Sequence, residues 1–341
     1  MSIVYLSPTT RGFGKIFDSV LLKCLKKKGF SVMKIAHKYL GYYNYEKTTM
    51  LSPITQISSF ENIDAVVGTF VEVSLPITFS VKAIVTPHVE PYPCLDVYLD
   101  LDDDIRQEPN FQKAMFWRRF AWEVCEMYGK NKIAFIVENP VDMKIVSQRF
   151  KTFLIYPNVE VLKRVDRNIK YDVVINYTYW KSFGVKVLKK ILDLLKGYRV
   201  AVHDYYNSLT VKDLVKRYDV DFYGELLFGD YINLYSSTKL AYIVTFQEAF
   251  GVRFYEIGQL TYVATNINFH DPAFPKVKYE ELPEFVKSVD EKAFMFQRER
   301  VIAKIDELNS KKFEDEVERV MDEIVSELDL KVYGIMRWFN V

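Results

Sequence analysis

Short apolar runs alternate with helix-sized segments along most of this chain, and they do so in two separate series. Because strands that alternate with helices form parallel sheets covered by helices on both faces, the pattern predicts an α/β protein with two doubly wound, Rossmann-like parallel sheets. The first series predicts strands over Ile3–Leu6, Ser31–Ile35, Ala65–Val67, Ala83–Thr86 and Lys132–Val137. The second predicts strands over Asp172–Asn176, Arg199–His203, Asp219–Tyr223, Ala241–Thr245 and Thr261–Thr265.

The two series are joined by residues 156–170, and a length of 341 residues suits two domains of about 150 residues each. We predict an N-terminal domain over 1–165 and a C-terminal domain over 166–327. The last residues, 328–341, are too apolar to remain in water and are expected to pack back on the N-terminal domain. Ligands of such sheets bind beyond the carboxyl ends of the strands, so the functional residues should follow strands and face a cleft between the domains.

The composition excludes several classes of protein. Lys and Arg number 46 against 45 Asp and Glu, so a formal charge of +1 gives no overall field that would draw nucleic acid or an anionic membrane. The three cysteines lack the spacing of a disulfide framework or a zinc site, and the N-terminus lacks a signal-peptide pattern. We therefore expect a cytoplasmic protein. Opposite charges three and four residues apart over 279–330 predict solvated helices.

Two segments bear on membrane contact. The stretch Ala65–Val81 approaches membrane-spanning length, but it contains Glu72 and Pro76, so we predict a buried strand and helix. Residues 113–124, KAMFWRRFAWEV, set four aromatic side chains beside two arginines, as interfacial helices do. A helix buried between layers has the same pattern. Core packing is the favoured interpretation, and peripheral membrane contact through 113–124 is the alternative.

Two glutamates stand eight positions apart directly after the predicted strand at 241–245. Residues 247–256 read QEAFGVRFYE, with Glu248 before Phe250–Gly251 and Glu256 after it. A helix that begins at the glycine would leave Glu248 in the preceding loop and place Glu256 within the helix. Free N–H groups at a helix N-terminus favour a diphosphate, and carboxylates on either side can accept hydrogen bonds from sugar hydroxyls. The pattern indicates a nucleotide-sugar site.

From Val220 onward the sequence predicts a strand, a glycine turn, a short helix that ends in LYSS, a second strand, the EAFG block and a second glutamate. The order of these features resembles that in the retaining GT-B glycosyltransferases of family 4. The loop YLSPTTRGFGK resembles that family's glycine-bearing loop, with Gly12 and Gly14. The strand IVTPHVEP is similar to the one that ends in a cleft histidine, here His88. The resemblance covers most of the chain, and the EAFG block is its specific part.

The resemblance implies a GT-B fold and transfer of a sugar from a nucleotide-diphosphate sugar to an acceptor hydroxyl, with retention of anomeric configuration. It implies no required metal or other cofactor. The acceptor would be a glycan, lipid or protein, and no nucleic acid is expected as a partner. Catalysis would involve His88, near the reacting carbon, and Glu248, at the donor-sugar hydroxyls. The implied donor-binding residues are Gly12, Gly14, Phe250, Gly251, Val252, Glu256 at the ribose hydroxyls, and Arg253 if it faces the cleft.

One departure from the family affects the leaving group. The family supplies an Arg and a Lys that neutralise the departing diphosphate, whereas this sequence reads INYTYWKSFG, with Tyr177 near the Arg position. Loss of both cations would cost on the order of several kcal/mol of transition-state stabilisation, so Lys181 is the candidate replacement. Aromatic residues that follow strands are expected to face the cleft and stack on sugars or bases: Tyr177, Tyr179, Trp180, Tyr205 and Tyr206.

Two alternatives stay open at this point. A single-domain, metal-dependent GT-A transferase is suggested by DVYLDLDDD, where Asp100, Asp102 and Asp104 could hold a divalent cation. The other alternative is a sugar-nucleotide or glycan-binding protein without catalytic activity, because the usual pair of cations is missing.

Overall fold

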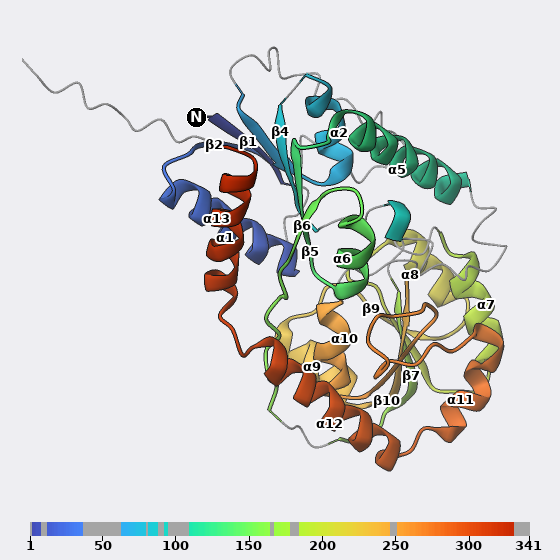
Figure 1. Cartoon of the computed structure of the whole chain (residues 1–341). Coiled ribbons are helices and arrows are strands. Elements are labelled where there is room, and N and C mark those ends of the chain that lie inside the picture. Colours follow the sequence, from blue (N-terminus) through green and yellow to red (C-terminus); the bar gives the residue numbers. More distant parts are fainter. Residues whose placement is uncertain are drawn as a thin grey trace, which may run out of the picture. The chain divides into compact units, whose positions relative to one another are not determined.

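The computed structural model describes residues 2–7, 12–36, 63–79, 81–87, 92–94, 109–163, 167–177, 184–245 and 251–330. These residues fall in two compact units (Figure 1). Unit 1 lies within Met1–Cys94, Ala114–Pro157 and Lys311–Val341, and unit 2 lies within Leu95–Lys113 and Asn158–Ser310. Each unit contains one parallel sheet flanked by helices, so the predicted α/β class with two doubly wound sheets is confirmed.

The sheet of unit 1 has six parallel strands in the order β2-β1-β3-β4-β5-β6. Its central strands are buried along their length, because helices on both faces demand continuous apolar runs. The strand order reverses between β1 and β3. The strands are β1 (Ser2–Ser7), β2 (Ser31–Ala36), β3 (Ala65–Gly68), β4 (Lys82–Val85), β5 (Ile133–Val137) and β6 (Lys151–Leu154).

The helices of unit 1 are α1 (Gly12–Lys27), α2 (Phe70–Thr78), α6 (Pro140–Val146), α13 (Phe313–Glu327) and the part of α5 (Pro109–Tyr128) from Ala114 onward. The stretch Ala65–Val81 forms β3 and α2, as predicted. Among the residues that the structure describes, no helix is long and apolar enough to cross a membrane. Cys24, Cys94 and Cys125 are buried, and none of the three forms a disulfide.

Helix α13 belongs to unit 1, although the predicted boundary placed it in the C-terminal domain. Its apolar face is buried in the same core as α1, and the rings of Phe17 and Phe313 lie 5.9 Å apart. Lys27 at the end of α1 pairs with Glu318 at 2.6 Å. The chain therefore returns to unit 1 at Lys311 because α13 covers apolar surface there. Residues 331–341 of the C-terminal segment lie outside the described ranges.

Unit 2 has five parallel strands in the order β11-β10-β7-β8-β9, so the strand order reverses between β7 and β10. Ligands of doubly wound sheets bind beyond the carboxyl ends of the strands at such a reversal. The strands are β7 (Tyr171–Tyr177), β8 (Val200–His203), β9 (Asp221–Tyr223), β10 (Thr238–Val244) and β11 (Tyr262–Thr265). The helices are α7 (Lys186–Leu194), α8 (Leu209–Lys216), α9 (Phe228–Ser236), α10 (Val252–Gly258), α11 (Leu282–Ser288) and α12 (Glu291–Leu308), with a 3-10 turn at Tyr279–Glu281.

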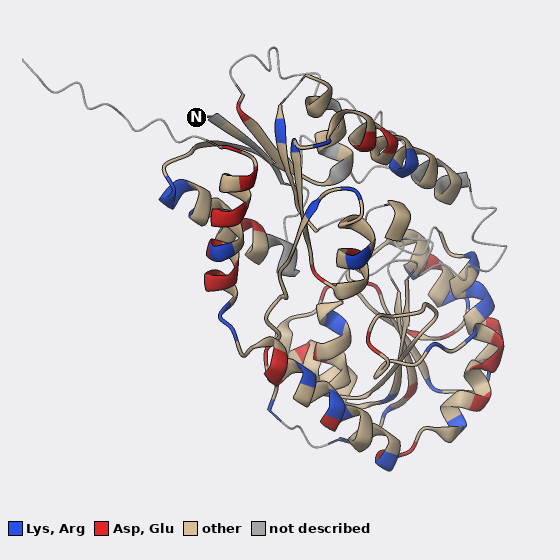
Figure 2. Ribbon diagram, viewed as in Figure 1, with Lys and Arg blue, Asp and Glu red and all other residues tan. Residues whose placement is uncertain are grey.

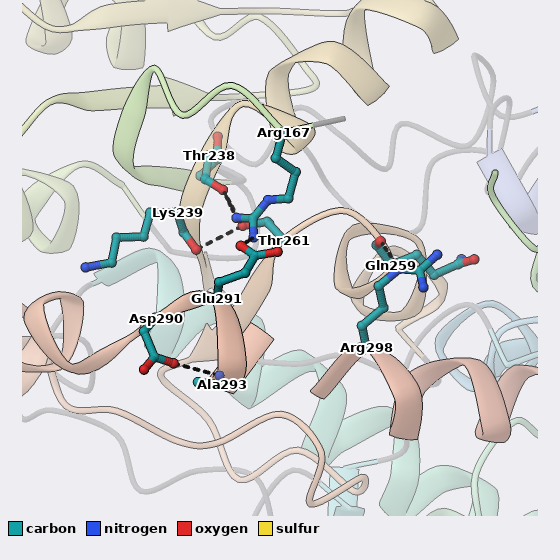
Figure 3. A network of polar contacts seen from close by, with 9 residues as sticks. All are labelled: Arg167, Thr238, Lys239, Gln259, Thr261, Asp290, Glu291, Ala293 and Arg298. Atoms are coloured by element: carbon teal, nitrogen blue, oxygen red, sulfur yellow. Dashed lines mark hydrogen bonds and ion pairs between the residues drawn. The ribbon is translucent and has the colours of Figure 1, made fainter. Parts of the chain in front are cut away.

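Polar side chains fasten α12 to the sheet of unit 2 at the amino end of β10 (Figure 3). Arg167 donates to Glu291 and to the Thr238 carbonyl, both at 2.7 Å, and its guanidinium lies 4.0 Å from the centre of the Phe294 ring. Burial lowers the pKa of Arg167, and Glu291 opposes that change. Further along α12, Arg298 donates to the Gln259 carbonyl at 2.9 Å. These bonds use backbone acceptors and carboxylates inside unit 2, so we assign this region a structural role.

Charged residues of both signs occur along α12 and α13 (Figure 2). Several form ion pairs within one turn of helix, such as Lys304 with Glu307 at 2.8 Å and Arg319 with Glu316 at 3.2 Å. The apolar residues of the same helices are buried. The charge-laced segment 279–330 therefore forms amphipathic helices, with charged faces in water, as its sequence predicts.

Candidate functional site

Two polar side chains end neighbouring strands in unit 2. Asn176 in β7 and His203 in β8 are paired in register, and both are buried, at 6% and 3% exposure. The strands before them are apolar, so neither residue is needed to complete the hydrophobic core. Because burial of a polar group is costly without a hydrogen bond, both side chains must find partners beyond the sheet.

The partner of both residues is Tyr235, a buried residue of α9. The Asn176 amide nitrogen donates to the Tyr235 hydroxyl at 2.6 Å, and that hydroxyl lies 2.8 Å from Nδ1 of His203. Since the Tyr235 oxygen accepts from Asn176, its own hydrogen points to Nδ1, and the neutral imidazole carries its proton on Nε2. We call Asn176, Tyr235 and His203 the Asn–Tyr–His network.

Arg253 reaches this network from α10. Its Nη1 donates to the Asn176 side-chain oxygen at 3.0 Å, so both ends of the Asn176 amide are engaged and its orientation is defined. Helix α10 begins after Gly251, whose φ of 72° and ψ of 50° lie in the left-handed region. Glycine adopts that conformation at little cost, and the turn there starts the helix that carries Arg253.

The electrostatics of the network keep His203 neutral. Burial is the main cause that lowers the pKa of His203 to about 4, and the positive charge of Arg253 adds to it. The nearby backbone of Gly224 opposes this lowering of the pKa in part. At neutral pH the imidazole therefore carries no charge, which preserves Nδ1 as an acceptor for Tyr235. The only full positive charge at this network comes from Arg253, among the residues that the structure describes.

Glu256 follows Arg253 by one turn of α10 and is partly buried. Its carboxylate makes no hydrogen bond or ion pair with any described residue, in contrast to most buried charges. Burial raises the pKa of Glu256, and the negative charge of Glu160 adds to that rise. Tyr231, whose ring lies 6.0 Å from that of His203, has a raised pKa from burial first and from the Glu256 charge second. A desolvated carboxylate without a donor is a candidate ligand group.

Some of the predicted site residues lie within the described ranges. Gly251 and Val252 stand at the start of α10, on the element that also carries Arg253 and Glu256. Gly12 and Gly14 lie in the first turn of α1 in unit 1. Four further predicted site residues lie outside the described ranges: His88, Lys181, Glu248 and Phe250. Tyr179 and Trp180 also lie outside them.

The expectation that Tyr177 faces ligand is wrong. Its side chain is fully buried, and its hydroxyl donates to the Gly184 carbonyl within unit 2. The last residue of a central strand is covered by helices, so this ring completes the core instead of forming a wall of the site. Tyr205 and Tyr206, which follow β8, are less buried than Tyr177. Tyr206 is 49% exposed, and the rings of Tyr205 and Tyr206 meet edge to face with their centres 5.3 Å apart.

Segment 113–124 lies in α5 and has two different sides. Trp122 is buried and packs against Phe135 and Phe150, with ring centres 5.8 and 5.2 Å away. Phe116 and Phe120 are 63% and 48% exposed. Core packing therefore accounts for one side of the helix, while the other presents aromatic rings to solvent.

No family model matches the sequence, and no curated protein matches it. Solved structures do match. Sucrose-phosphate synthase from Thermosynechococcus elongatus aligns at a TM-score of 0.58 and 12% identity, covering 96% of this chain and 99% of that one. The Anabaena protein Alr3699/HepE, in complex with UDP and glucose, aligns at 0.58 and 13%, covering 96% and 100%.

The Arabidopsis thaliana protein UGT89C1, complexed with UDP-L-rhamnose, aligns at a TM-score of 0.51 and 10% identity, covering 96% of this chain and 98% of that one. Together with the two parallel sheets, these matches show that the chain has the fold of GT-B glycosyltransferases. A single-domain GT-A architecture is incompatible with two separate sheets, so that alternative is wrong. Asp100, Asp102 and Asp104, on which it depended, lie outside the described residues.

Proposed function

We propose that this protein is a glycosyltransferase that moves a sugar from a nucleotide-diphosphate sugar to an acceptor hydroxyl, with retention of anomeric configuration and without a metal. The observation that carries the proposal is the Glu256 carboxylate, which is partly buried and has no hydrogen-bond donor among the described residues. It stands one turn from Arg253 on a helix that follows β10, at the reversal of strand order. That is where doubly wound sheets bind nucleotides.

Glu256 has the chemistry needed for a ribose. A carboxylate can accept two hydrogen bonds from neighbouring hydroxyls, and such charge-assisted bonds are stronger than those between neutral groups. The environment that raises the pKa of Glu256 has already removed much of its water, so ribose hydroxyls would replace little solvent. The resemblance to the retaining GT-B glycosyltransferases of family 4 assigns the same role to this glutamate.

The rest of the donor site follows from the resemblance. Backbone N–H groups of Phe250, Gly251 and Val252 would contact sugar and phosphate, while Glu248 would hold the donor-sugar hydroxyls. Gly12 and Gly14 would permit close approach of the diphosphate. Two of the neighbours described above were solved with UDP and glucose and with UDP-L-rhamnose, which supports a uridine diphosphate sugar as the first donor to test.

The proposed reaction needs no nucleophile from the protein. The acceptor oxygen attacks the anomeric carbon from the face that the diphosphate leaves, and a diphosphate oxygen takes the acceptor proton. His88 would lie near the reacting carbon, where a neutral imidazole can hydrogen-bond without a fixed charge. A glycan, lipid or protein could supply the hydroxyl. For a lipid acceptor, the exposed rings of Phe116 and Phe120 on α5 are the natural membrane contact.

Thermal stabilisation by nucleotides tests the donor site. We expect a nucleoside diphosphate from the set UDP, GDP, ADP, CDP and dTDP to raise the melting temperature of the wild type, because a ligand that binds only the folded state stabilises it. Glu256→Ala should abolish most of that rise. Glu299→Gln, which changes an exposed glutamate of α12, is the matched control and should retain it. A full thermal shift in Glu256→Ala would contradict the donor-site assignment.

A further inference from the structure

Arg253 brings a guanidinium to the carboxyl end of β7. Its bond to Asn176 joins α10 to that strand at 3.0 Å, next to the reversal of strand order between β7 and β10. A guanidinium carries five N–H groups in a planar fork, and this fork matches the oxygens of a phosphate. The family of the proposed function instead places its cations on the segment after β7.

The orientation of the acceptor for Arg253 is set by buried groups. Asn176 can offer its oxygen to Arg253 only while its nitrogen points to Tyr235, and Tyr235 accepts that bond only while its hydrogen points to His203. All three side chains are buried, from 0% to 6% exposed. Buried side chains that are bonded to one another in this way have few alternative arrangements, so the network fixes the position of Arg253 through Asn176, although Nε2 of His203 is buried without a hydrogen-bond partner among the described residues.

We propose that Arg253 binds the diphosphate of the donor and stabilises its charge as the leaving group, and that the Asn–Tyr–His network positions Arg253 for this task. The inference rests on the proposed function. It names the residues that stabilise the departing diphosphate, a role for which the sequence suggested Lys181. When the bond between the anomeric carbon and the diphosphate oxygen breaks, its electron pair goes to that oxygen. The guanidinium stabilises the resulting charge, and the acceptor proton ends on the diphosphate.

A neutral histidine suits this arrangement. A charged imidazolium would carry a proton on Nδ1, which would remove the acceptor for Tyr235 and break the chain of bonds that ends at Arg253. The network therefore holds the charged Arg253, and its own histidine, His203, adds no second positive charge. This separates the roles: Arg253 contacts the ligand, whereas Asn176, Tyr235 and His203 act through it.

The discriminating measurement is the ratio of affinities for a nucleoside diphosphate and its monophosphate. We would titrate the wild type by calorimetry with UDP and UMP, and with the corresponding GDP, ADP, CDP and dTDP pairs. In Arg253→Gln the preference for diphosphate should fall about 10-fold or more, since a charge-assisted bidentate contact is lost, while monophosphate affinity changes little. Arg253→Lys keeps the charge without the fork and should give an intermediate ratio.

Tyr235→Phe tests the positioning role. It removes one hydroxyl and should lower the diphosphate preference about 3-fold to 10-fold, because Arg253 loses its fixed partner. Tyr242→Phe is the matched control: it is a buried tyrosine of the same unit whose hydroxyl donates to the Val277 carbonyl at 2.7 Å. That variant should lose stability but keep the wild-type ratio. Circular dichroism and melting curves establish that each variant is folded.

The outcomes separate the two proposals. Binding of a nucleoside diphosphate by the wild type, with an unchanged preference in both Arg253→Gln and Arg253→Lys, would overturn this inference and leave the proposed function standing. An equal loss of preference in Tyr235→Phe and Tyr242→Phe would overturn the positioning role. Absence of binding by the wild type to every nucleotide tested would overturn the proposed function and this inference together.

Discussion

Asn176 and Tyr177 are neighbours at the end of β7, yet their side chains do different things. Asn176 joins the buried network with Tyr235, His203 and Arg253, whereas the Tyr177 ring completes the core. Successive side chains of a strand point to opposite faces, so one residue can serve a site while the next cannot. The sequence showed that both follow an apolar run, but not which face each occupies.

His203 predicts how stability depends on pH. Burial and the Arg253 charge lower its pKa from 6.5 to about 4, so between these values the unfolded chain binds a proton that the folded chain excludes. The contribution of His203 to stability is therefore fully present above pH 6.5 and is lost as the pH falls toward 4, by about 3 kcal/mol in all. Urea denaturation should show a smaller decrease in His203→Gln than in the wild type. An equal pH dependence in both proteins would contradict this assignment.

Edge strands and long-range helix packing mark the limits of prediction at the scale of elements. Strand β6 was not predicted, because Lys151–Leu154 is short, half-exposed and at the edge of its sheet, where apolar periodicity is weak. The predicted strands match β1 to β5 and β7 to β11 within a few residues. The sequence did not predict that α13 packs on α1. The pattern of a charged, amphipathic helix shows which face is apolar, but it does not specify which core that face covers.

The packing of α13 predicts a specific loss of stability. Met321 is fully buried in the core shared with α1, and Met321→Ala should lower the free energy of unfolding by about 2–5 kcal/mol, since it leaves a cavity. Glu318→Ala removes only an exposed partner of Lys27 and should cost less than about 1 kcal/mol. Urea denaturation measures both changes. A cost below about 1 kcal/mol for Met321→Ala would contradict the role of α13 in unit 1.

At the scale of the whole molecule, the sequence predicted more of the fold than of the candidate site. Two series of apolar strands sufficed for the α/β class, and structures only 12–13% identical to this chain share its GT-B fold. The Asn–Tyr–His network brings together residues from β7, β8 and α9 that lie up to 59 positions apart. No local pattern encodes such a meeting. The one available signal was a polar residue at the end of each of two adjacent strands.

A formal charge of +1 gives the whole chain no field that would attract an anionic donor, so the proposed function assigns donor selection to local groups such as Arg253 and Glu256. The most direct test of the account is release of nucleoside diphosphate from a set of nucleotide sugars in EDTA, beginning with UDP-glucose, with the first sugar product followed by NMR. We expect release by the wild type, a product with the anomeric configuration of the donor, and at least a roughly 10-fold lower rate in Glu256→Ala. Inverted configuration, dependence on an added metal, or no release from any nucleotide sugar would contradict the proposed function.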